Sequence, residues 1–218
     1  MLNICEIFTS IQGESTLAGY LCTFVRLSGC NLRCAWCDTR YSYDNANGDG
    51  GGVLMSIDDI VAQVSKTPVE LIEITGGEPL LQTDVTALCR ELLRLNYKVM
   101  IETNGTQNIK TIPQEVRRII DIKCPDSGHG GSFLADNLKY MTPNDEIKFV
   151  LASIDDAVWA KNFCDTHKLL SKCPVTFSPV SRTLPLGRLA GWMAENHVFG
   201  IRLGLQLHKV IWGDKRGV

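Results

Sequence analysis

Short apolar runs rich in β-branched residues recur along the chain and predict buried strands. These runs are Leu21–Leu27, Val69–Thr75, Lys98–Thr103, Arg118–Lys123, Glu146–Leu151, Pro174–Ser178 and Phe199–Leu205. Most are continuous rather than alternating between apolar and polar residues, which is typical of strands that a parallel sheet buries on both faces. An earlier run, Leu2–Phe8, is expected to add a strand at an edge of the sheet.

Amphipathic segments separate these strands and predict helices. Ser56 and Asp59 form a capping-box signal at the start of a helix over Ile57–Ser65. The next helix has its apolar face at Val85, Leu88, Leu92 and Leu95, and two more are expected over Asp155–Leu170 and Leu186–His197. A strand followed by a helix, repeated along the chain, predicts a parallel sheet with right-handed crossovers.

This alternation predicts an α/β fold in the form of a partial, open (β/α) barrel. The 218 residues are fewer than the roughly 250 of a complete eight-unit barrel, so we expect a shortened version in a single domain over residues 1–218. The segment Asn45–Gly52 is rich in Gly and Asn and breaks the pattern. It is expected to be a surface loop, because strands continue on both sides of it.

The composition is that of a globular protein, with 44% hydrophobic and 21% charged residues. No apolar run approaches the length needed to cross a membrane. With 22 basic and 24 acidic residues the formal charge is -2, which provides no broad basic surface for phosphates. We therefore expect neither a membrane nor a nucleic-acid partner. Nine cysteines, an odd number, and the lack of an apolar leader favour reduced thiols in the cytoplasm over a disulfide framework.

Three of the cysteines lie close together in sequence. Cys30, Cys34 and Cys37 follow the spacing C-x3-C-x2-C after a predicted strand, so a loop can fold their thiols around one centre. Three thiolates suit a soft metal or an iron–sulfur cluster, and a 4Fe-4S cluster on three cysteines leaves one iron open. A structural zinc site normally needs four ligands, and no second Cys or His pair has the spacing to complete one. The cysteines expected in the apolar core are Cys5, Cys22, Cys89, Cys164 and Cys173.

Polar or glycine-rich motifs follow one predicted strand after another. Besides the cysteine loop, they are Thr75–Pro79, Glu102–Gly105, Lys123–Gly128 and Ser178–Val180. Any one of them alone would indicate an ordinary turn. Parallel strands end at the same edge of a sheet, and α/β proteins bind their ligands there. Together the motifs therefore predict one functional site.

The cysteine spacing, with Trp36 before the third cysteine, and the later Gly76-Gly77-Glu78-Pro79 resemble the radical S-adenosylmethionine superfamily. The resemblance implies a radical-SAM-type barrel, with a 4Fe-4S cluster on Cys30, Cys34 and Cys37 that reductively cleaves S-adenosylmethionine to a 5'-deoxyadenosyl radical. The implied contacts of S-adenosylmethionine are Trp36, Cys37, Asp38, Gly76, Gly77, Glu78, Lys123, Cys124, Pro125, Ser178, Pro179 and Val180. Glu78 would lie near the ammonium of the methionine moiety or order its own turn. The segment Lys123–Gly128 departs from the Ser-Pro-Lys-like element of many relatives, and we expect its Cys124 to be packed rather than bound to the cluster.

Within the superfamily, the chain from about residue 4 to 209 resembles the 7-carboxy-7-deazaguanine synthase family. The segments that carry this resemblance are Ile7–Glu14, Phe24–Cys30, Cys37–Thr39 and Leu205–Lys209. It implies a lyase that converts 6-carboxy-5,6,7,8-tetrahydropterin to 7-carboxy-7-deazaguanine with loss of ammonia, in queuosine biosynthesis. It also implies Mg2+ at Thr39, a homodimer, and an electron donor such as flavodoxin or ferredoxin.

The substrate-binding residues implied by the same resemblance are Ile11, Gln12, Gly13, Glu14, Arg26, Thr75 and His208. An arginine fork suits the carboxylate of the substrate, and the carboxylate of Glu14 can accept from ring N–H and amino groups. Other roles stay open: a strand-end ion pair for Arg26, a structural position for His208, and a turn or helix cap for Thr39.

Two alternative functions remain. A small activase that makes a glycyl radical on a partner protein shares the cysteine and Gly-Gly-Glu-Pro motifs. It would not explain Gln12-Gly13-Glu14 or the carboxyl-terminal Gln206-x-His208-Lys209. A non-enzymatic zinc-binding module is the second alternative, and the series of strand-end motifs disfavours it.

Overall fold

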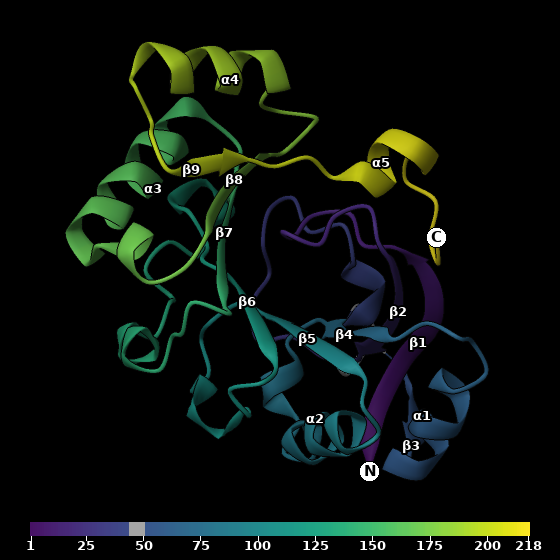
Figure 1. Ribbon diagram of the computed structural model, residues 1–218. Coiled ribbons are helices and arrows are strands. Elements are labelled where there is room, and N and C mark those ends of the chain that lie inside the picture. The colour runs from purple at the N-terminus through teal and green to yellow at the C-terminus, as the bar shows by residue number, and fades with distance from the viewer. Residues whose placement is uncertain (44–50) are drawn as a thin grey trace.

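A computed structural model describes residues 1–43 and 51–218. Its strands form one sheet in the order β3-β1-β2-β4-β5-β6-β7-β8-β9 (Figure 1). The strands are β1 (Leu2–Ile11), β2 (Leu21–Leu27), β3 (Val53–Met55), β4 (Leu71–Gly76), β5 (Lys98–Thr103), β6 (Arg117–Asp121), β7 (Glu146–Leu151), β8 (Val175–Pro179) and β9 (Ile201–Leu203). The α-helices are α1 (Ile57–Val64), α2 (Val85–Arg94), α3 (Ile154–His167), α4 (Leu186–Glu195) and α5 (Leu207–Trp212). Short 3-10 helices span Arg40–Ser42, Pro79–Leu81, Ile109–Thr111, Pro125–Ser127, Ala135–Lys139 and Leu169–Ser171.

Strands β2 and β4 to β9 are neighbours in the sheet and run parallel to one another. Strand β1 is antiparallel to both β2 and β3. The sheet curves without closing, with α1 and α2 beside its β1–β5 half and α3 and α4 beside its β7–β9 half (Figure 1). Helix α5 lies apart from them, on the open inner side. The prediction of an α/β fold in the form of an open, partial barrel is confirmed.

The prediction that the first strand lies at the edge of the sheet is wrong. β3 pairs with the start of β1, with Leu2 opposite Met55 and Ile4 opposite Val53, and takes the edge position itself. β3 has only three residues, and Val53 and Leu54 are exposed. A strand of this length has too few positions to show an alternating pattern, so periodicity could not detect it.

Local sequence signals predicted the starts of the helices more accurately than their ends. The capping box of α1 is formed, because Ser56 Oγ accepts from the Asp59 amide at 3.1 Å and Asp59 Oδ2 accepts from the Ser56 amide at 3.3 Å. The helix expected over Asp155–Leu170 ends earlier, at His167, because Lys168 adopts a left-handed conformation with φ of 51°. Helix α5 was not predicted.

The helices bury two apolar clusters against the sheet. One joins α1 and α2 to β1, β2, β4 and β5, and the other joins α3 and α4 to β6, β7 and β8. Cys22, Cys89, Cys164 and Cys173 are buried as expected. The prediction that Cys5 lies in the core is wrong, because its thiol is only partly buried and accepts from Arg216 Nη2 at 3.7 Å.

The loop predicted over Asn45–Gly52 is described only at its end, because residues 45–50 lie outside the described residues. Across residues 1–43 and 51–218, no helix combines the length and apolar character that a membrane span needs.

Candidate active site

A cavity of about 230 Å³ opens on the inner side of the sheet, where the parallel strands end. We call it the inner cavity. Its lining includes these predicted residues: Ile11, Gln12, Gly13, Glu14, Arg26, Cys30, Cys34, Trp36, Cys37, Asp38, Thr39, Thr75, Gly76, Gly77, Lys123, Val180 and His208. Five others lie outside the lining: Glu78, Cys124, Pro125, Ser178 and Pro179. The fold therefore brings together most of the residues that the sequence singled out.

Gly76 and Gly77 let the end of β4 approach the cysteine loop. Gly76 has φ of +147°, and a Cβ at Gly77 would lie 2.1 Å from the Gly29 carbonyl oxygen and 2.7 Å from Cys30 Cβ. The Gly77 amide donates to the Leu27 oxygen at 3.2 Å, and the Glu78 amide donates to the Gly29 oxygen at 2.8 Å. Any side chain at position 77 would push the cysteine loop away from β4.

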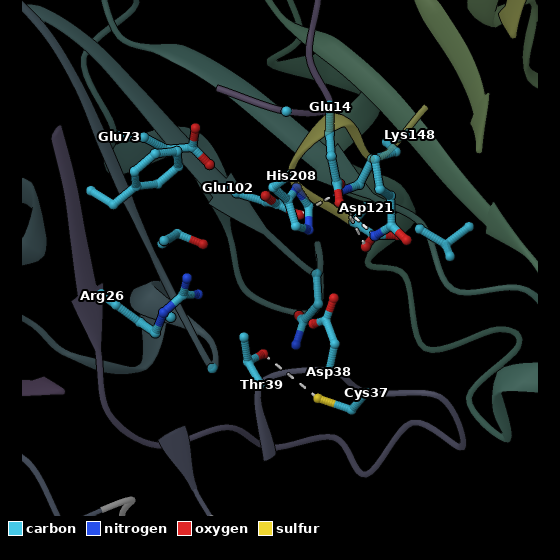
Figure 2. A pocket seen from close by; sticks show the side chains of 18 of the residues that line it. Glu14, Arg26, Cys37, Asp38, Thr39, Glu73, Glu102, Asp121, Lys148 and His208 are labelled. Atoms are coloured by element: carbon cyan, nitrogen blue, oxygen red, sulfur yellow. Dashed lines mark hydrogen bonds and ion pairs between the residues drawn. The ribbon is translucent and has the colours of Figure 1, made fainter. Parts of the chain in front are cut away.

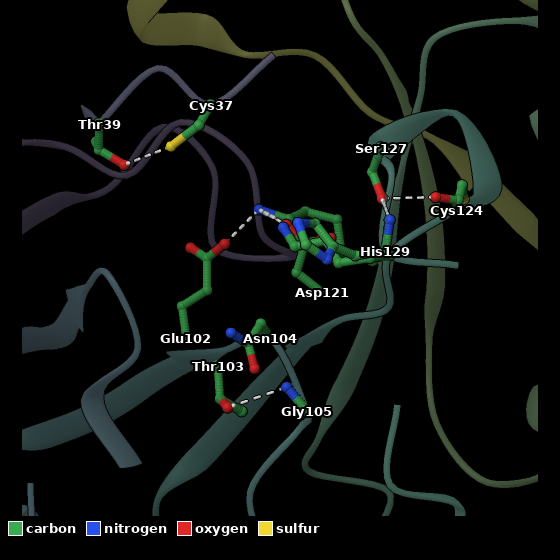
Figure 3. Close-up of polar contacts among 12 residues, drawn as sticks. Cys37, Thr39, Glu102, Thr103, Asn104, Gly105, Asp121, Cys124, Ser127 and His129 are labelled. Atoms are coloured by element: carbon green, nitrogen blue, oxygen red, sulfur yellow. Dashed lines mark hydrogen bonds and ion pairs between the residues drawn. The ribbon is translucent and has the colours of Figure 1, made fainter. Parts of the chain in front are cut away.

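The carboxylate of Glu78 orders the loops rather than facing the inner cavity. It is fully buried and accepts from the Leu80 amide at 3.0 Å, the Thr103 hydroxyl at 2.8 Å and the Asn104 amide at 2.6 Å. Asn104 then donates to Asn31 Oδ1 at 3.0 Å (the Thr103–Gly105 turn is drawn in Figure 3). These bonds join the ends of β4 and β5 to the cysteine loop in one rigid unit.

The cysteine loop is also held from the opposite side by the segment after β6. The Arg33 amide donates to His129 Nε2 at 2.9 Å, and the Ala35 amide donates to the Ser127 oxygen at 3.1 Å. Ser127 in turn donates to the Cys124 oxygen at 2.6 Å (Figure 3). Cys124 is fully buried, so its thiol is packed. The segment therefore supports the cysteine loop through backbone contacts and through His129, not through this thiol.

Lys148, on β7, is the centre of a network of charges on one wall of the inner cavity. Its ammonium lies 2.5 Å from Glu14 Oε2, 2.6 Å from Glu102 Oε1 and 3.8 Å from Asp121 Oδ2 (Figure 2). Lys123 joins it through Asp121 Oδ2 at 2.8 Å. We call these five residues the acid–lysine network.

Burial and charge act in opposite directions on this network. Burial raises the pKa of Glu14, but the charges of Lys148 and His208 more than reverse this and lower it to about 2. Burial alone would lower the pKa of Lys148, but Glu102 and Glu14 raise it well above its ordinary value. Both groups are therefore charged at neutral pH.

The segment that follows β1 and the segment that leads into α5 meet beside this network. Gln206 donates to Glu14 Oε1 at 2.6 Å, and the Leu207 amide donates to the Gly13 oxygen at 3.0 Å. A Cβ at Gly13 would lie 2.5 Å from His208 Nδ1, so a larger residue would displace the His208 imidazole. Gln12 accepts from the Glu14 amide at 2.8 Å and so holds this segment in its turn.

Similarity to known proteins identifies the family of this chain. Residues 24–158 match the model of the "Radical SAM superfamily". The chain is 45% identical to 7-carboxy-7-deazaguanine synthase from Koribacter versatilis, over 97% of both chains. It belongs to the 7-carboxy-7-deazaguanine synthase family. The protein of that name from Chlorobaculum tepidum is 41% identical over 100% of this chain and 97% of its own.

A solved structure has the same fold. The crystal structure of QueE from Escherichia coli matches 94% of this chain and 93% of its own, with a TM-score of 0.74 and 23% sequence identity. At this identity the likeness concerns the fold alone. It extends the agreement from the region of the superfamily model to nearly the whole sheet.

Members of the radical S-adenosylmethionine superfamily use a 4Fe-4S cluster and S-adenosylmethionine, and the cysteines of this synthase family member fit such a cluster. Cys30, Cys34 and Cys37 all carry free thiols and line the inner cavity. Among the described residues, no three Cys, His, Asp or Glu side chains converge as the ligands of a single ion do. The three thiolates of a cube-shaped cluster bind three different irons, so they surround a volume instead of a point.

The structure places Arg26 in an ion pair and also at the inner cavity. Its Nε donates to Glu6 Oε1 at 2.8 Å, while its guanidinium faces the cavity (Figure 2). Tyr41 donates to the same Glu6 oxygen at 2.9 Å, and Arg216 donates to Glu6 Oε2 at 2.9 Å. The ion pair therefore fixes one edge of the guanidinium and leaves the remaining N–H groups on the cavity side.

Thr39 also faces the inner cavity, with its hydroxyl 3.7 Å from the Cys37 thiol (Figure 2). It occupies the cap position of the 3-10 helix Arg40–Ser42, but its side chain makes no capping hydrogen bond. The hydroxyl is thus not used by the helix that follows it.

Sequence reasoning gave no individual role to four charged residues that line the inner cavity: Glu73, Glu102, Asp121 and Lys148. Of these, only Glu102 belongs to a predicted strand-end motif, Glu102–Gly105. All four belong to strands that were predicted as buried. A charged side chain inside an otherwise apolar buried strand is costly unless it has a partner or a function. That contrast was visible in the sequence and could have indicated them.

Proposed function

We propose that this protein converts 6-carboxy-5,6,7,8-tetrahydropterin to 7-carboxy-7-deazaguanine with loss of ammonia, as a radical S-adenosylmethionine lyase in queuosine biosynthesis. Its family membership over 97% of the chain supports this activity. The observation that carries it in the fold is the convergence of Gln12–Glu14, Arg26 and His208 on the same cavity as the three cysteines. The activase alternative leaves this convergence without a purpose.

In this proposal the chain holds and orients two ligands. Cys30, Cys34 and Cys37 would hold the 4Fe-4S cluster, which when bound would supply the electron for cleavage of S-adenosylmethionine. The predicted contacts that line the cavity, among them Trp36, Asp38 and Lys123, bind S-adenosylmethionine. Gly76 and Gly77 allow the backbone to approach it closely. The loops around it are shaped by the predicted residues outside the lining, which are Glu78, Cys124, Pro125, Ser178 and Pro179.

The pterin lies in the same cavity, beside Glu14 and Arg26. The Glu14 carboxylate, ionised at neutral pH, accepts from the amino and ring N–H groups of the substrate. Arg26 binds its carboxylate with the N–H groups that Glu6 leaves free, and Thr75 and His208 add polar contacts. Mg2+ is bound by the Thr39 hydroxyl together with substrate oxygens, since this ion keeps few protein ligands.

We further propose that the enzyme works in the cytoplasm as a homodimer and receives electrons from a donor such as flavodoxin or ferredoxin. The free state of its nine cysteines suits a reducing compartment.

The decisive experiment is anaerobic incubation of the reconstituted protein with the carboxypterin, S-adenosylmethionine, Mg2+ and a reductant. Mass analysis is expected to detect 7-carboxy-7-deazaguanine and released ammonia. An intact cluster that cleaves S-adenosylmethionine without forming this product would refute the lyase and favour the activase. A colourless protein with stoichiometric zinc would refute both radical functions.

Arg26→Ala is expected to raise KM for the carboxypterin roughly ten- to a hundredfold, since a charge-assisted hydrogen bond is worth about 1.5–3 kcal/mol. Cleavage of S-adenosylmethionine is expected to continue, because Arg26 is not itself one of the predicted contacts of that ligand. Glu6→Gln is the matched control: it removes the charged partner of Arg26 but keeps the guanidinium at the cavity. If both variants impair turnover equally, Arg26 acts only through its ion pair.

A further inference from the structure

Glu73 is a buried acid on the wall of the inner cavity that neither the family resemblance nor the proposed function uses. It lies on β4, opposite Phe24 of β2 and two residues before Thr75, so it shares the cavity-facing side of β4 with Thr75. Its exposed fraction is 2%. Figure 2 shows its carboxyl group on a different side of the cavity from Glu14 and Lys148.

The only hydrogen bond of the Glu73 side chain within the described residues comes from an amide. Gln12 Nε2 donates to Glu73 Oε2 at 2.9 Å. Lys148, the nearest candidate for an ion pair, directs its ammonium to Glu14 and Glu102 instead. Glu73 therefore has a neutral donor on one oxygen and, among the described residues, no ion-pair partner, although the charge of Lys148 favours its ionised form from a distance.

Gln12 couples Glu73 to Glu14. Its Oε1 accepts from the amides of Glu14 and Ser15, both at 2.8 Å, while its Nε2 holds Glu73. Since both ends of this one amide are used, the buried Gln12 fixes the Glu73 carboxyl group relative to the backbone of Glu14. The Glu14 carboxylate itself is held by Lys148 and Gln206.

The two acids differ in charge. Burial, and next the negative charge of Glu102, raise the pKa of Glu73 to about 8, while the pKa of Glu14 falls to about 2. At neutral pH Glu14 is a carboxylate that only accepts hydrogen bonds, whereas Glu73 is mainly a neutral acid with an O–H to donate. The cavity therefore presents both an acceptor and a donor carboxyl group.

These two groups suit an aminopyrimidinone ring, which carries an amino group and a ring N–H as donors and a carbonyl oxygen as acceptor. A second carboxylate at Glu73 would repel that carbonyl oxygen, while a neutral acid can bind it. We infer that Glu73 binds the substrate as a neutral carboxylic acid, donating its O–H to an acceptor of the heterocycle whose donors are bound by Glu14. The inference rests on the proposed function and adds a specificity-determining residue to it.

The test is the pH dependence of KM for the carboxypterin in the reconstituted holoenzyme. Binding that requires neutral Glu73 is complete below pH 8 and is lost as the pH rises through that value. Wild-type KM is therefore expected to rise roughly tenfold per pH unit above about 8. Other titratable or charged side chains face the same cavity, so a variant must assign the change. They are Glu14, Arg26, Cys30, Cys34, Cys37, Asp38, Tyr43, Glu102, Asp121, Lys123, Lys148, His208 and Lys209.

Glu73→Gln supplies that assignment, because its amide can accept from Gln12 and donate to the substrate but cannot ionise. Its KM is expected to stay within about threefold of wild type at pH 7 and to remain flat up to pH 9. Glu73→Leu removes the donor and is expected to raise KM at least tenfold at both pH values. Iron content and thermal unfolding establish that each holoenzyme is intact.

Two results would overturn the inference. One is an alkaline rise in KM that is the same in wild type and Glu73→Gln, because the titrating group would then be another residue. The other is an unchanged KM in a folded Glu73→Leu enzyme. If that variant does not fold, the comparison of wild type with Glu73→Gln still decides. Lack of product from the wild-type enzyme would instead refute the proposed function itself.

Discussion

Replacing Cys34 by alanine is expected to reduce cleavage of S-adenosylmethionine to the background rate, and the same holds for Cys30 and Cys37. The three thiols line one cavity, and no other cysteine of the described residues lines it, since the nearby Cys124 is fully buried. Removing one ligand leaves an iron without its protein bond, so the cluster is lost or can no longer hold S-adenosylmethionine in place.

Two measurements check this result after anaerobic reconstitution: iron per chain and the 5'-deoxyadenosine formed with a chemical reductant. Cys5→Ala is the matched control, because Cys5 is also a partly buried free thiol but lies outside the inner cavity. It should keep its iron and its cleavage activity. Four irons and normal cleavage in Cys34→Ala would contradict the assignment of the cluster to this loop.

Lys148→Met is expected to have the second largest effect, because it removes the cation that holds three carboxylates together. The Lys148 side chain is 6% exposed and pairs with Glu14, Glu102 and Asp121. Breaking a buried ion pair by removing one partner costs about 3–5 kcal/mol, since the other charge remains buried. Pterin turnover should fall at least a hundredfold, because Glu14 loses the contact that fixes its carboxylate.

The pH dependence of stability distinguishes loss of charge from loss of packing. Glu14 has its pKa lowered in the folded state to about 2, so its pairing contributes stability above its ordinary pKa of about 4. That contribution disappears as the pH falls from about 4 to 2. The melting temperatures of wild type and Lys148→Met should therefore differ most at neutral pH and converge in acid.

Two further variants interpret the Lys148 result. Lys148→Arg keeps the charge and should recover most of the lost stability, though not the full turnover, because its fork cannot reproduce the same contacts. Lys161→Met removes an exposed lysine that pairs with Asp165 at 2.8 Å and should change stability by less than about 0.5 kcal/mol. A gap in melting temperature that is independent of pH would contradict the charge-based explanation.

The sheet was predictable because its signals are local. Continuous apolar runs identified β2 and β4 to β8. The parallel order was predicted from strand–helix alternation, although only short 3-10 helices separate β5 from β6 and β6 from β7. The errors occurred where local signals are weak or absent. The three-residue β3 displaced β1 from the edge, and α5 is held by contacts with Gly13 rather than by a strong pattern of its own.

The site was predictable in part for a similar reason. Cys30, Cys34 and Cys37 are near neighbours in sequence, and each strand-end motif is continuous, so their common location follows from the direction of parallel strands. The dual position of Arg26 was different. Both its ion pair and its place at the cavity depend on the register of β1 against β2, with Glu6 opposite Arg26.

By itself the sequence determined the cysteine loop, the succession of β2 and β4 to β8 along the chain, and the edge at which the ligands bind, because these depend on spacing and periodicity within short segments. Only the tertiary structure decided which charges meet. Lys148 contacts Glu14 across 134 positions, and Gln206 contacts Glu14 across 192. Such partners are selected by sheet register, strand curvature and the packing of α5, and the protonation of Glu73 depends on the neighbours that this packing supplies.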